Sequence, residues 1–236
     1  MIATEERPTQ VFEEDARGCG YRQIAGLDEA GGGPLAGPVV GAAVILPRRF
    51  ALEGLNDSKQ VRPEDREILF KAITRSARAW GIGVATEQEI DTINILEATR
   101  LAWRRALDQL PVAPDFLLID ATTLPGVSMA QRAIVKGDRL SLSIAAASIL
   151  AKVHRDRLMQ EYHRRYPDYL FHLHKGYPTP DHLRLIQQFG PSPVHRRSFK
   201  PIKTLLQSGK EDACLLYTSD AADDTPCVDL GGRRII

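Results

Sequence analysis

Short apolar runs alternate with longer polar segments of helical periodicity along most of the chain. Five runs are typical of buried strands, and they cover residues 24–27, 39–46, 80–85, 116–119 and 133–135. A glycine-rich loop joins the first two runs, which predicts two neighbouring antiparallel strands.

Three helices are predicted around these strands. Pro63, followed by Glu64 and Asp65, marks a helix start, because proline suits the first turn and acids suit the positive end of the helix dipole. The apolar stripe of this helix is expected at residues 68, 69, 72 and 73. Helical spacing predicts a second helix whose core face runs from 95 to 110, and a third begins near Ser141. The remaining chain, to about residue 203, is predicted to be helical and basic.

Strands that alternate with helices after an initial strand pair indicate the α/β fold class. We expect a mixed central β-sheet flanked by helices on both faces, with a helical basic C-terminal part. One domain over residues 21–203 accounts for this pattern, with a polar N-terminal extension over 1–20 and a C-terminal segment over 204–213.

The last 23 residues, 214–236, read CLLYTSDAADDTPCVDLGGRRII and differ in character from the preceding chain. They resemble a translated sequencing adapter. We therefore expect a non-native tail and leave it out of the functional argument.

Composition places the protein among ordinary globular proteins. Its 236 residues are 43% hydrophobic and 26% charged, which suits one substantial core. We expect no membrane anchor or secretion signal, because no apolar segment reaches about 18 residues and the first residues are acidic. The three cysteines show no metal-ligand spacing, which favours a reducing compartment, and a cytoplasmic location is expected.

The formal net charge of +1 conceals a basic segment. Residues 152–203 contain eleven Lys or Arg against four acids, as suits a polyanionic partner such as nucleic acid. A solvated helical face is the alternative interpretation.

The candidate chemistry begins at Asp28 and Glu29, which end the first apolar run and precede Gly31, Gly32 and Gly33. Successive side chains on a strand point to opposite faces, so the two acids are expected to share one metal centre only if the chain leaves strand geometry there. The glycines permit that departure. An ordinary acidic turn is the alternative.

Asp120 and Asp138 also follow predicted strands. Ligands of helix-covered sheets collect at strand ends, and carboxylates without nearby His or Cys favour Mg²⁺ or Mn²⁺ over zinc. A pair of such ions about 4 Å apart can hydrolyse a phosphodiester. Taken singly, Asp120 could be a turn residue and Asp138 could stabilise a helix start.

A nucleotide-binding loop at GGGPLA is disfavoured, because no helix follows to receive a pyrophosphate.

Eight motifs in order resemble the type 2 ribonuclease H family, ribonuclease HII. They read GLDEAGGGPLAGP (26–38), LNDSK (55–59), GIGV (81–84), LID (118–120), IVKGD (134–138), SIAAASILAKVHRDR (143–157), HKGYPT (174–179) and HRRSF (195–199).

The resemblance implies an RNase H-like fold in which Asp28, Glu29, Asp120 and Asp138 bind the catalytic metals, Mn²⁺ or Mg²⁺, with two ions per site during catalysis. It also implies that a glycine loop and a tyrosine, here Gly31, Gly32, Gly33 and Tyr177, read the ribose 2′-hydroxyl. Lys59 and Lys175 are candidate phosphate contacts. His172 and His174 are expected at the surface rather than on zinc. Gly32 stands where the family has arginine.

The implied activity is metal-dependent hydrolysis of the RNA strand of RNA/DNA hybrids, with incision 5′ of single ribonucleotides in duplex DNA. The products would carry 3′-hydroxyl and 5′-phosphate ends. We expect a monomer that binds RNA/DNA hybrid duplexes and ribonucleotide-containing DNA, and no membrane. The alternative is a hybrid-binding protein whose catalysis is impaired because Gly32 replaces the family arginine.

Overall fold

The computed structural model describes residues 7–207, which fall into two compact units divided after Arg196. The described part of the second unit includes a helix over residues 200–207. The first unit is built on a five-stranded sheet in the order β3-β2-β1-β4-β5. Its strands are β1 (Ile24–Ala30), β2 (Val39–Ile45), β3 (Ala79–Ala85), β4 (Phe116–Asp120) and β5 (Ala130–Ile134).

The sheet is mixed, as predicted. β1 pairs antiparallel with β2 and parallel with β4, while β2–β3 is antiparallel and β4–β5 is parallel. The helices of this unit are α1 (Val11–Gly18), α2 (Pro63–Ser76), α3 (Glu87–Asp108), α4 (Gly137–Leu140), α5 (Leu142–Arg165), the 3-10 helix η1 (Pro167–Tyr169), α6 (Phe171–His174) and α7 (Pro180–Phe189).

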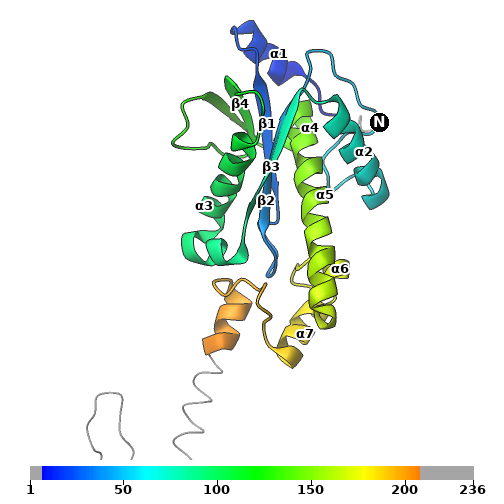
Figure 1. Ribbon diagram of the computed structural model, residues 1–236, viewed down its shortest axis with the longest axis vertical. Coiled ribbons are helices and arrows are strands. Elements are labelled where there is room, and N and C mark those ends of the chain that lie inside the picture. Colours follow the sequence, from blue (N-terminus) through cyan, green and yellow to red (C-terminus); the bar gives the residue numbers. More distant parts are fainter. Residues whose placement is uncertain (1–6, 208–236) are drawn as a thin grey trace, which may run out of the picture. The chain divides into compact units, whose positions relative to one another are not determined.

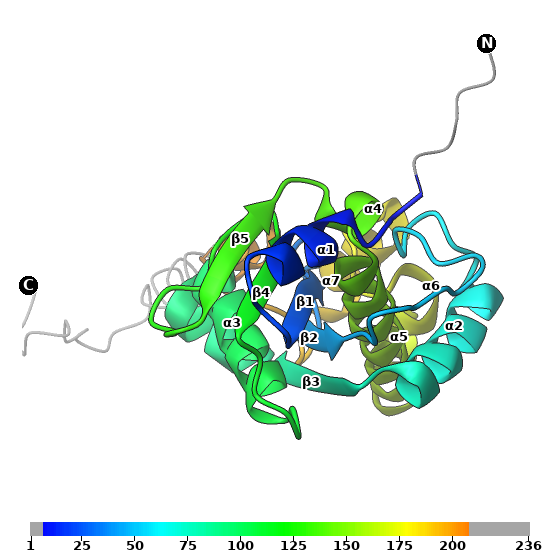
Figure 2. The same ribbon diagram turned by 90° about the horizontal axis from the view of Figure 1, so that it is seen from above.

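The sheet lies between two helical layers, with α3 on one face and α5 on the other (Figures 1 and 2). Both faces are covered, and every residue of β2 is accordingly buried. Glycines in the strands allow both helices to pack closely on the sheet. A Cβ on Gly41 would lie 2.8 Å from the Trp103 side chain of α3, and a Cβ on Gly26 would lie 2.2 Å from the α5 backbone. Buried alanines at 145, 146 and 147 complete the contact on the α5 side.

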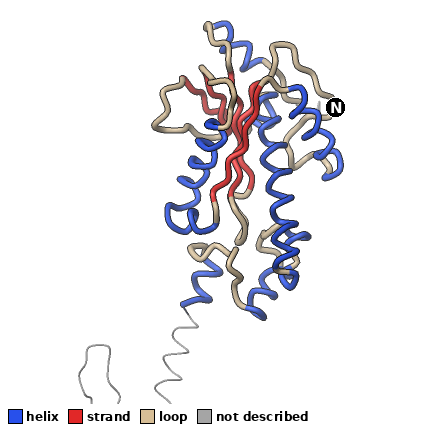
Figure 3. The backbone as a smooth tube through the Cα atoms, viewed as in Figure 1, coloured by secondary structure: helices blue, strands red, loops and turns tan. Residues whose placement is uncertain are grey.

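Two predicted helix starts, those of α2 and α5, are confirmed by local capping features. Pro63 occupies the first turn of α2, and Ser141 caps α5 by accepting a hydrogen bond from Ile144 N at 3.3 Å. The start of α3 is a capping box, in which Thr86 and Glu89 each accept from the other's backbone N–H. Figure 3 shows these helices around the red strands of the sheet.

Several predicted boundaries and faces were wrong. β1 continues through Asp28 and Glu29 to Ala30 instead of ending at residue 27, and β5 covers 130–134 rather than 133–135. Ile68 of the predicted α2 stripe is 66% exposed, whereas Leu69 and Ile73 of the same helix are buried.

Residues 1–20 include helix α1, which is tied to the core by a buried acid. Glu13 is 1% exposed and accepts hydrogen bonds from Ser141 Oγ, Ser143 N and Ser143 Oγ at 2.6–2.9 Å. This part of the predicted extension therefore supports the N-terminus of α5.

The predicted tail over 214–236 lies outside the described residues, as do residues 208–213. Among residues 7–207, no helix combines the length and apolar character needed to span a membrane.

Candidate active site

Two of the four predicted acids lie at the carboxyl ends of adjacent parallel strands. The pairing of β1 with β4 ends at Leu27 and Ile119, so Asp28 and Asp120 immediately follow it. Asp138 lies in the short helix α4, just after β5, and Gly137 N donates a hydrogen bond of 2.7 Å to Asp120 Oδ1. Strand order therefore brings three separate chain segments to one edge of the sheet.

The expected break in strand geometry at Asp28 and Glu29 does not occur. Both residues remain paired with β2, opposite Ala42 and Gly41, and the chain turns only after Ala30. Asp28 is 5% exposed, and its Oδ1 accepts a hydrogen bond of 2.7 Å from Glu29 N. Regular strand geometry thus holds the Asp28 carboxylate in place.

The acids influence one another electrostatically. Burial, then the charges of Glu29 and Asp120, hold the pKa of Asp28 well above its usual range. Burial and the charge of Asp120 raise the pKa of Glu29 to about 7. Burial also raises the pKa of Asp120, even though Gly137 N–H stabilises its charged form. These shifts define one shared site of excess negative charge.

Asp57, from the LNDSK motif, is a fifth acid that sequence reasoning missed. It is 1% exposed, and its charge and hydrogen bond, after burial, raise the pKa of Asp138 to about 6. Asp57 Oδ1 accepts from Lys59 N at 2.9 Å, and Arg139 Nη2 donates to Oδ2 at 3.2 Å. From this motif only Lys59 was predicted as a functional residue. Asp57 connects the 55–59 segment to α4 through Arg139.

Lys59 carries the positive charge of this site. Burial opposes its charged form, but the carboxylates of Asp57, Asp138 and Asp28 together raise its pKa. The Lys59 side chain is exposed, so its ammonium can reach solvent or a bound anion. That position suits a phosphate contact beside the acids.

The donor chemistry fits a hard divalent cation. The gathered side chains end in carboxylate oxygens, which suit Mg²⁺ or Mn²⁺. An added cation would stabilise the charged forms that burial first, and neighbouring carboxylates second, disfavour. Within residues 7–207, however, no three His, Cys, Asp or Glu side chains form a ready group for holding a metal ion.

The glycine loop lies between β1 and β2, and its three glycines have different roles. Gly31 has φ of +106°, and a Cβ there would meet the Arg155 side chain at 2.3 Å, so the position requires glycine. A Cβ on Gly32 would meet nothing within 4 Å. A Cβ on Gly33 would lie 3.9 Å from the Tyr177 ring. The loop thus adjoins the predicted tyrosine, and Gly32 has room for a Cβ atom.

Tyr177 is 42% exposed, and its main chain is held from beneath by histidines. Ser192 N donates to His195 Nδ1 at 2.9 Å, so the proton of the neutral His195 ring is on Nε2. His195 Nε2 then donates to His182 Nε2 at 3.0 Å, and His182 Nδ1 donates to Tyr177 O at 2.9 Å. These hydrogen bonds form a relay from residue 192 to the tyrosine.

The histidines were not recognised from the sequence as a structural cluster. His174, expected at the surface, is half-buried and stacks on His182 with ring centroids 4.1 Å apart. Burial lowers the pKa of His182 to about 4 and that of His195 to about 3. Both rings are therefore neutral at physiological pH, as the relay requires.

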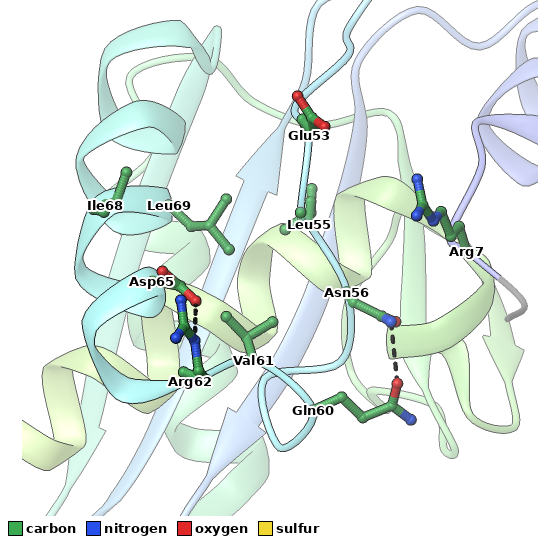
Figure 4. Close-up of a pocket in the computed structure, with 11 residues that line it drawn as sticks. Arg7, Glu53, Leu55, Asn56, Gln60, Val61, Arg62, Asp65, Ile68 and Leu69 are labelled. Carbon is green, nitrogen blue, oxygen red and sulfur yellow. Dashed lines mark hydrogen bonds and ion pairs between the residues drawn. The ribbon is translucent and has the colours of Figure 1, made fainter.

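A recess of about 540 Å³ lies beside the LNDSK segment and is lined by Asn56 and Gln60 among others (Figure 4). Its polar groups are largely paired with one another: Asn56 Nδ2 donates to Gln60 Oε1 at 3.0 Å, and Arg62 Nε donates to Asp65 Oδ2 at 2.7 Å.

A mixed sheet with carboxylates at the ends of its central strands defines a protein of the RNase H-like class. Comparisons with known proteins agree. The ribonuclease H2 structure from Pyrococcus horikoshii OT3 matches with a TM-score of 0.66 and 28% identity, covering 79% of this chain and 98% of that one. The family model described as Ribonuclease HII matches residues 25–202. The chain belongs to the ribonuclease HII family.

Relatives named Ribonuclease HII match most of the chain. The Myxococcus xanthus protein is 55% identical over 196 residues, covering 83% of this chain and 67% of its own. The Syntrophotalea carbinolica protein is 50% identical over 206 residues, covering 87% and 99%. The protein is therefore a hydrolase of the ribonuclease H type, an endoribonuclease acting on RNA/DNA hybrids.

Proposed function

We propose that the protein cuts the RNA strand of hybrids and also incises 5′ of a single ribonucleotide embedded in duplex DNA, leaving 3′-hydroxyl and 5′-phosphate ends. Asp28, Glu29, Asp120 and Asp138 are the proposed ligands of two divalent ions, Mg²⁺ or Mn²⁺. The gathering of acids from β1, β4 and α4 at one end of the sheet supports this assignment. Their raised pKa values agree with it, since burial first and then the neighbouring carboxylates raise them. This activity would serve the removal of ribonucleotides from DNA.

The bound ions would activate water and neutralise the leaving oxygen. The protein's own groups orient the acids before substrate arrives: Glu29 N–H holds Asp28, and Gly137 N–H holds Asp120. Lys59 stands beside them for a phosphate oxygen. Such preorganised charges act with little rearrangement during the reaction.

Recognition of the ribose is proposed for the loop of Gly31, Gly32 and Gly33 together with Tyr177. The closeness of Gly33 to the Tyr177 ring supports this grouping, because main-chain donors and an aromatic face then adjoin each other. Lys175 is a proposed phosphate contact, and its main chain is anchored by Arg155 Nη1, which donates to Lys175 O at 3.1 Å. The basic segment over 152–203 would bind the remaining duplex.

The direct test incubates the full chain and Mg²⁺ or Mn²⁺ with three end-labelled duplexes. One contains a single ribonucleotide in DNA, one is an RNA/DNA hybrid, and one is all DNA. Cleavage is expected on the first two, with the cut 5′ of the lone ribonucleotide and a ligatable 5′-phosphate. An uncut lone ribonucleotide beside a cleaved hybrid would refute the incision proposal alone.

Asp138→Asn tests the ligand assignment. Loss of one carboxylate should abolish turnover while leaving salt-sensitive duplex binding, because the basic segment is untouched. Asp108→Asn, an exposed acid at the end of α3, is the matched control and should cut normally. Cleavage by Asp138→Asn at the parental rate would show that Asp138 is no ligand.

Impaired catalysis through Gly32 is the second candidate. It is favoured by the absence of the side chain that the family motif supplies, a charge-assisted contact worth about 1.5–3 kcal/mol. A Cβ at position 32 would meet nothing within 4 Å, which makes Gly32→Arg a suitable test. If the parent binds both substrate duplexes without cutting and Gly32→Arg cuts them, this candidate holds. If the parent cuts, it fails.

A further inference from the structure

Two fully buried arginines lie against the glycine loop. Arg155 comes from α5 and is 1% exposed, and Arg196 comes from the segment after α7 and is 0% exposed. Neither belongs to the four predicted metal ligands or to the predicted substrate-binding residues. Their guanidinium groups donate to main-chain carbonyls of the loop between β1 and β2.

Arg196 holds both ends of this loop. Its Nη2 donates to Gly31 O at 2.6 Å and to Pro38 O at 3.2 Å, its Nη1 donates to Gly32 O at 3.1 Å, and its Nε donates to Gly37 O at 2.8 Å. In a trans peptide, the C=O and the following N–H point in opposite directions. Because the Gly31 and Gly32 carbonyls face Arg196, the N–H groups of Gly32 and Gly33 face away from it.

Arg155 joins the loop to the segment that carries the tyrosine. It donates to Pro38 O at 3.0 Å, to Ala36 O at 3.1 Å and to Lys175 O at 3.1 Å, and its guanidinium lies 6.0 Å from the Tyr177 ring centroid. The two arginines thus fix the loop and the base of Tyr177 in one network.

Burying two charged guanidinium groups side by side is energetically unfavourable for the fold. Burial and the neighbouring Arg155 lower the pKa of Arg196 to about 9, and Glu87 provides partial compensation. Buried charges often stabilise a fold less than apolar residues of similar volume. Orientation of the carbonyls is a better reason for two adjacent guanidinium groups, since a fork of N–H donors fixes several peptide planes at once.

We propose that Arg196, supported by Arg155, is a positioning residue for ribose recognition. It turns the Gly32 and Gly33 N–H groups outward, toward a ribose 2′-oxygen that they would bind. The inference rests on the proposed function of the glycine loop and adds the residue that orients it. Because these four hydrogen bonds from Arg196 end on main-chain oxygens of the loop, the orientation that they impose does not depend on the side chain at position 32.

The test compares Arg196→Lys with the parent, since lysine keeps the charge but loses the planar fork. Arg105→Lys is the matched control, because Arg105 also donates to a main-chain carbonyl, Val84 O, and pairs with Glu89, but it belongs to α3. Binding of the single-ribonucleotide duplex and the all-DNA duplex is measured in an Asp138→Asn background, where no cleavage is expected. Steady-state cleavage is measured without that background change.

We expect about a tenfold binding preference for the ribonucleotide duplex, lost with Arg196→Lys and kept with Arg105→Lys. The kcat/KM for the lone ribonucleotide should fall about 30-fold to 100-fold, while affinity for all-DNA duplex stays within about twofold. Unchanged preference and cleavage in a folded Arg196→Lys protein would overturn the proposal. Equal weakening on both duplexes would show a merely structural role and would also overturn it.

Arg155→Lys provides the second variant if Arg196→Lys does not fold. The same loss of preference would support the network, and retained preference would overturn it. A parent that cuts the lone ribonucleotide but is insensitive to both variants refutes only the positioning role. A parent that neither prefers nor cuts that duplex refutes the proposed recognition function, and this inference falls with it.

Discussion

Acidification should expose the energetic contribution of the histidine relay beneath Tyr177. His182 and His195 are buried and neutral, with pKa values of about 4 and about 3 in the fold. Their unfolded value is about 6.5, so the unfolded chain binds protons first as the pH falls. Stability from these groups is fully present above about pH 6.5 and is lost as the pH falls below it.

The magnitude follows from linkage. Between pH 8 and pH 5, a histidine shifted from about 6.5 to about 3 removes about 2 kcal/mol from the free energy of unfolding. Glu29 opposes this trend, because its pKa is raised to about 7 and its protonation in the fold adds about 2.5 kcal/mol over the same interval. The pH dependence of the parent's free energy of unfolding therefore does not show the histidine contribution by itself.

A difference measurement separates the two effects. Urea unfolding at pH 8 and pH 5 is compared for the parent and for His195→Asn, which keeps an acceptor for Ser192 N–H but cannot titrate. The parent should be the more stable at pH 8, and its advantage should shrink by about 2 kcal/mol at pH 5. Ser192→Ala is the control: it removes the hydroxyl 2.8 Å from His195 Nδ1 and should lower stability without changing that pH dependence.

A stability gap between parent and His195→Asn that is equal at both pH values would refute the reasoning. It would mean that the His195 ring binds protons as readily in the fold as in the unfolded chain.

Three further predictions concern the acids and the core. Asp57→Asn should lower the pKa of Asp138, because the Asp57 charge helps to raise it, and the acidic limb of the pH–rate profile should move to lower pH; an unmoved limb would contradict this. Mn²⁺ affinity, measured by calorimetry, should be about tenfold weaker or more at pH 6 than at pH 8, because protons compete at Glu29 and Asp138; equal affinities would argue against these ligands. Trp103→Ala should cost about 3–5 kcal/mol in chemical denaturation, because Trp103 is 1% exposed against β2; a loss below about 1 kcal/mol would mean that the site collapses around the gap.

Much of the sheet was predictable because its central strands, such as β2 and β4, are largely buried and read as continuous apolar runs. The ends of those runs placed Asp120 at the end of β4 and Asp138 just beyond β5. The boundary of β1 was wrong because the sequence alone does not show that Asp28 and Glu29 keep their pairing with β2. A polar residue can continue a strand wherever a neighbouring strand supplies its hydrogen bonds.

The missed residues share a different cause. Asp57 contacts Arg139 across 82 positions, and Arg196 reaches Gly31 across 165. No local periodicity encodes such contacts, and a buried arginine looks in sequence like a member of a basic surface segment. Arg155 and Arg196 were in fact counted in the segment assigned to duplex binding, whereas the fold buries both of them.

The position of Arg196 changes the significance of Gly32. In the proposed function, glycine at position 32 removes a side-chain contact with phosphate, and extra backbone freedom would ordinarily loosen the loop as well. Here the carbonyls on both sides of that residue, Gly31 O and Gly32 O, are held by one guanidinium, so the peptide planes stay oriented despite the glycine. The expected defect is therefore weaker phosphate binding with ribose discrimination intact, which Gly32→Arg would repair as a gain in affinity for all duplexes rather than as a gain in selectivity.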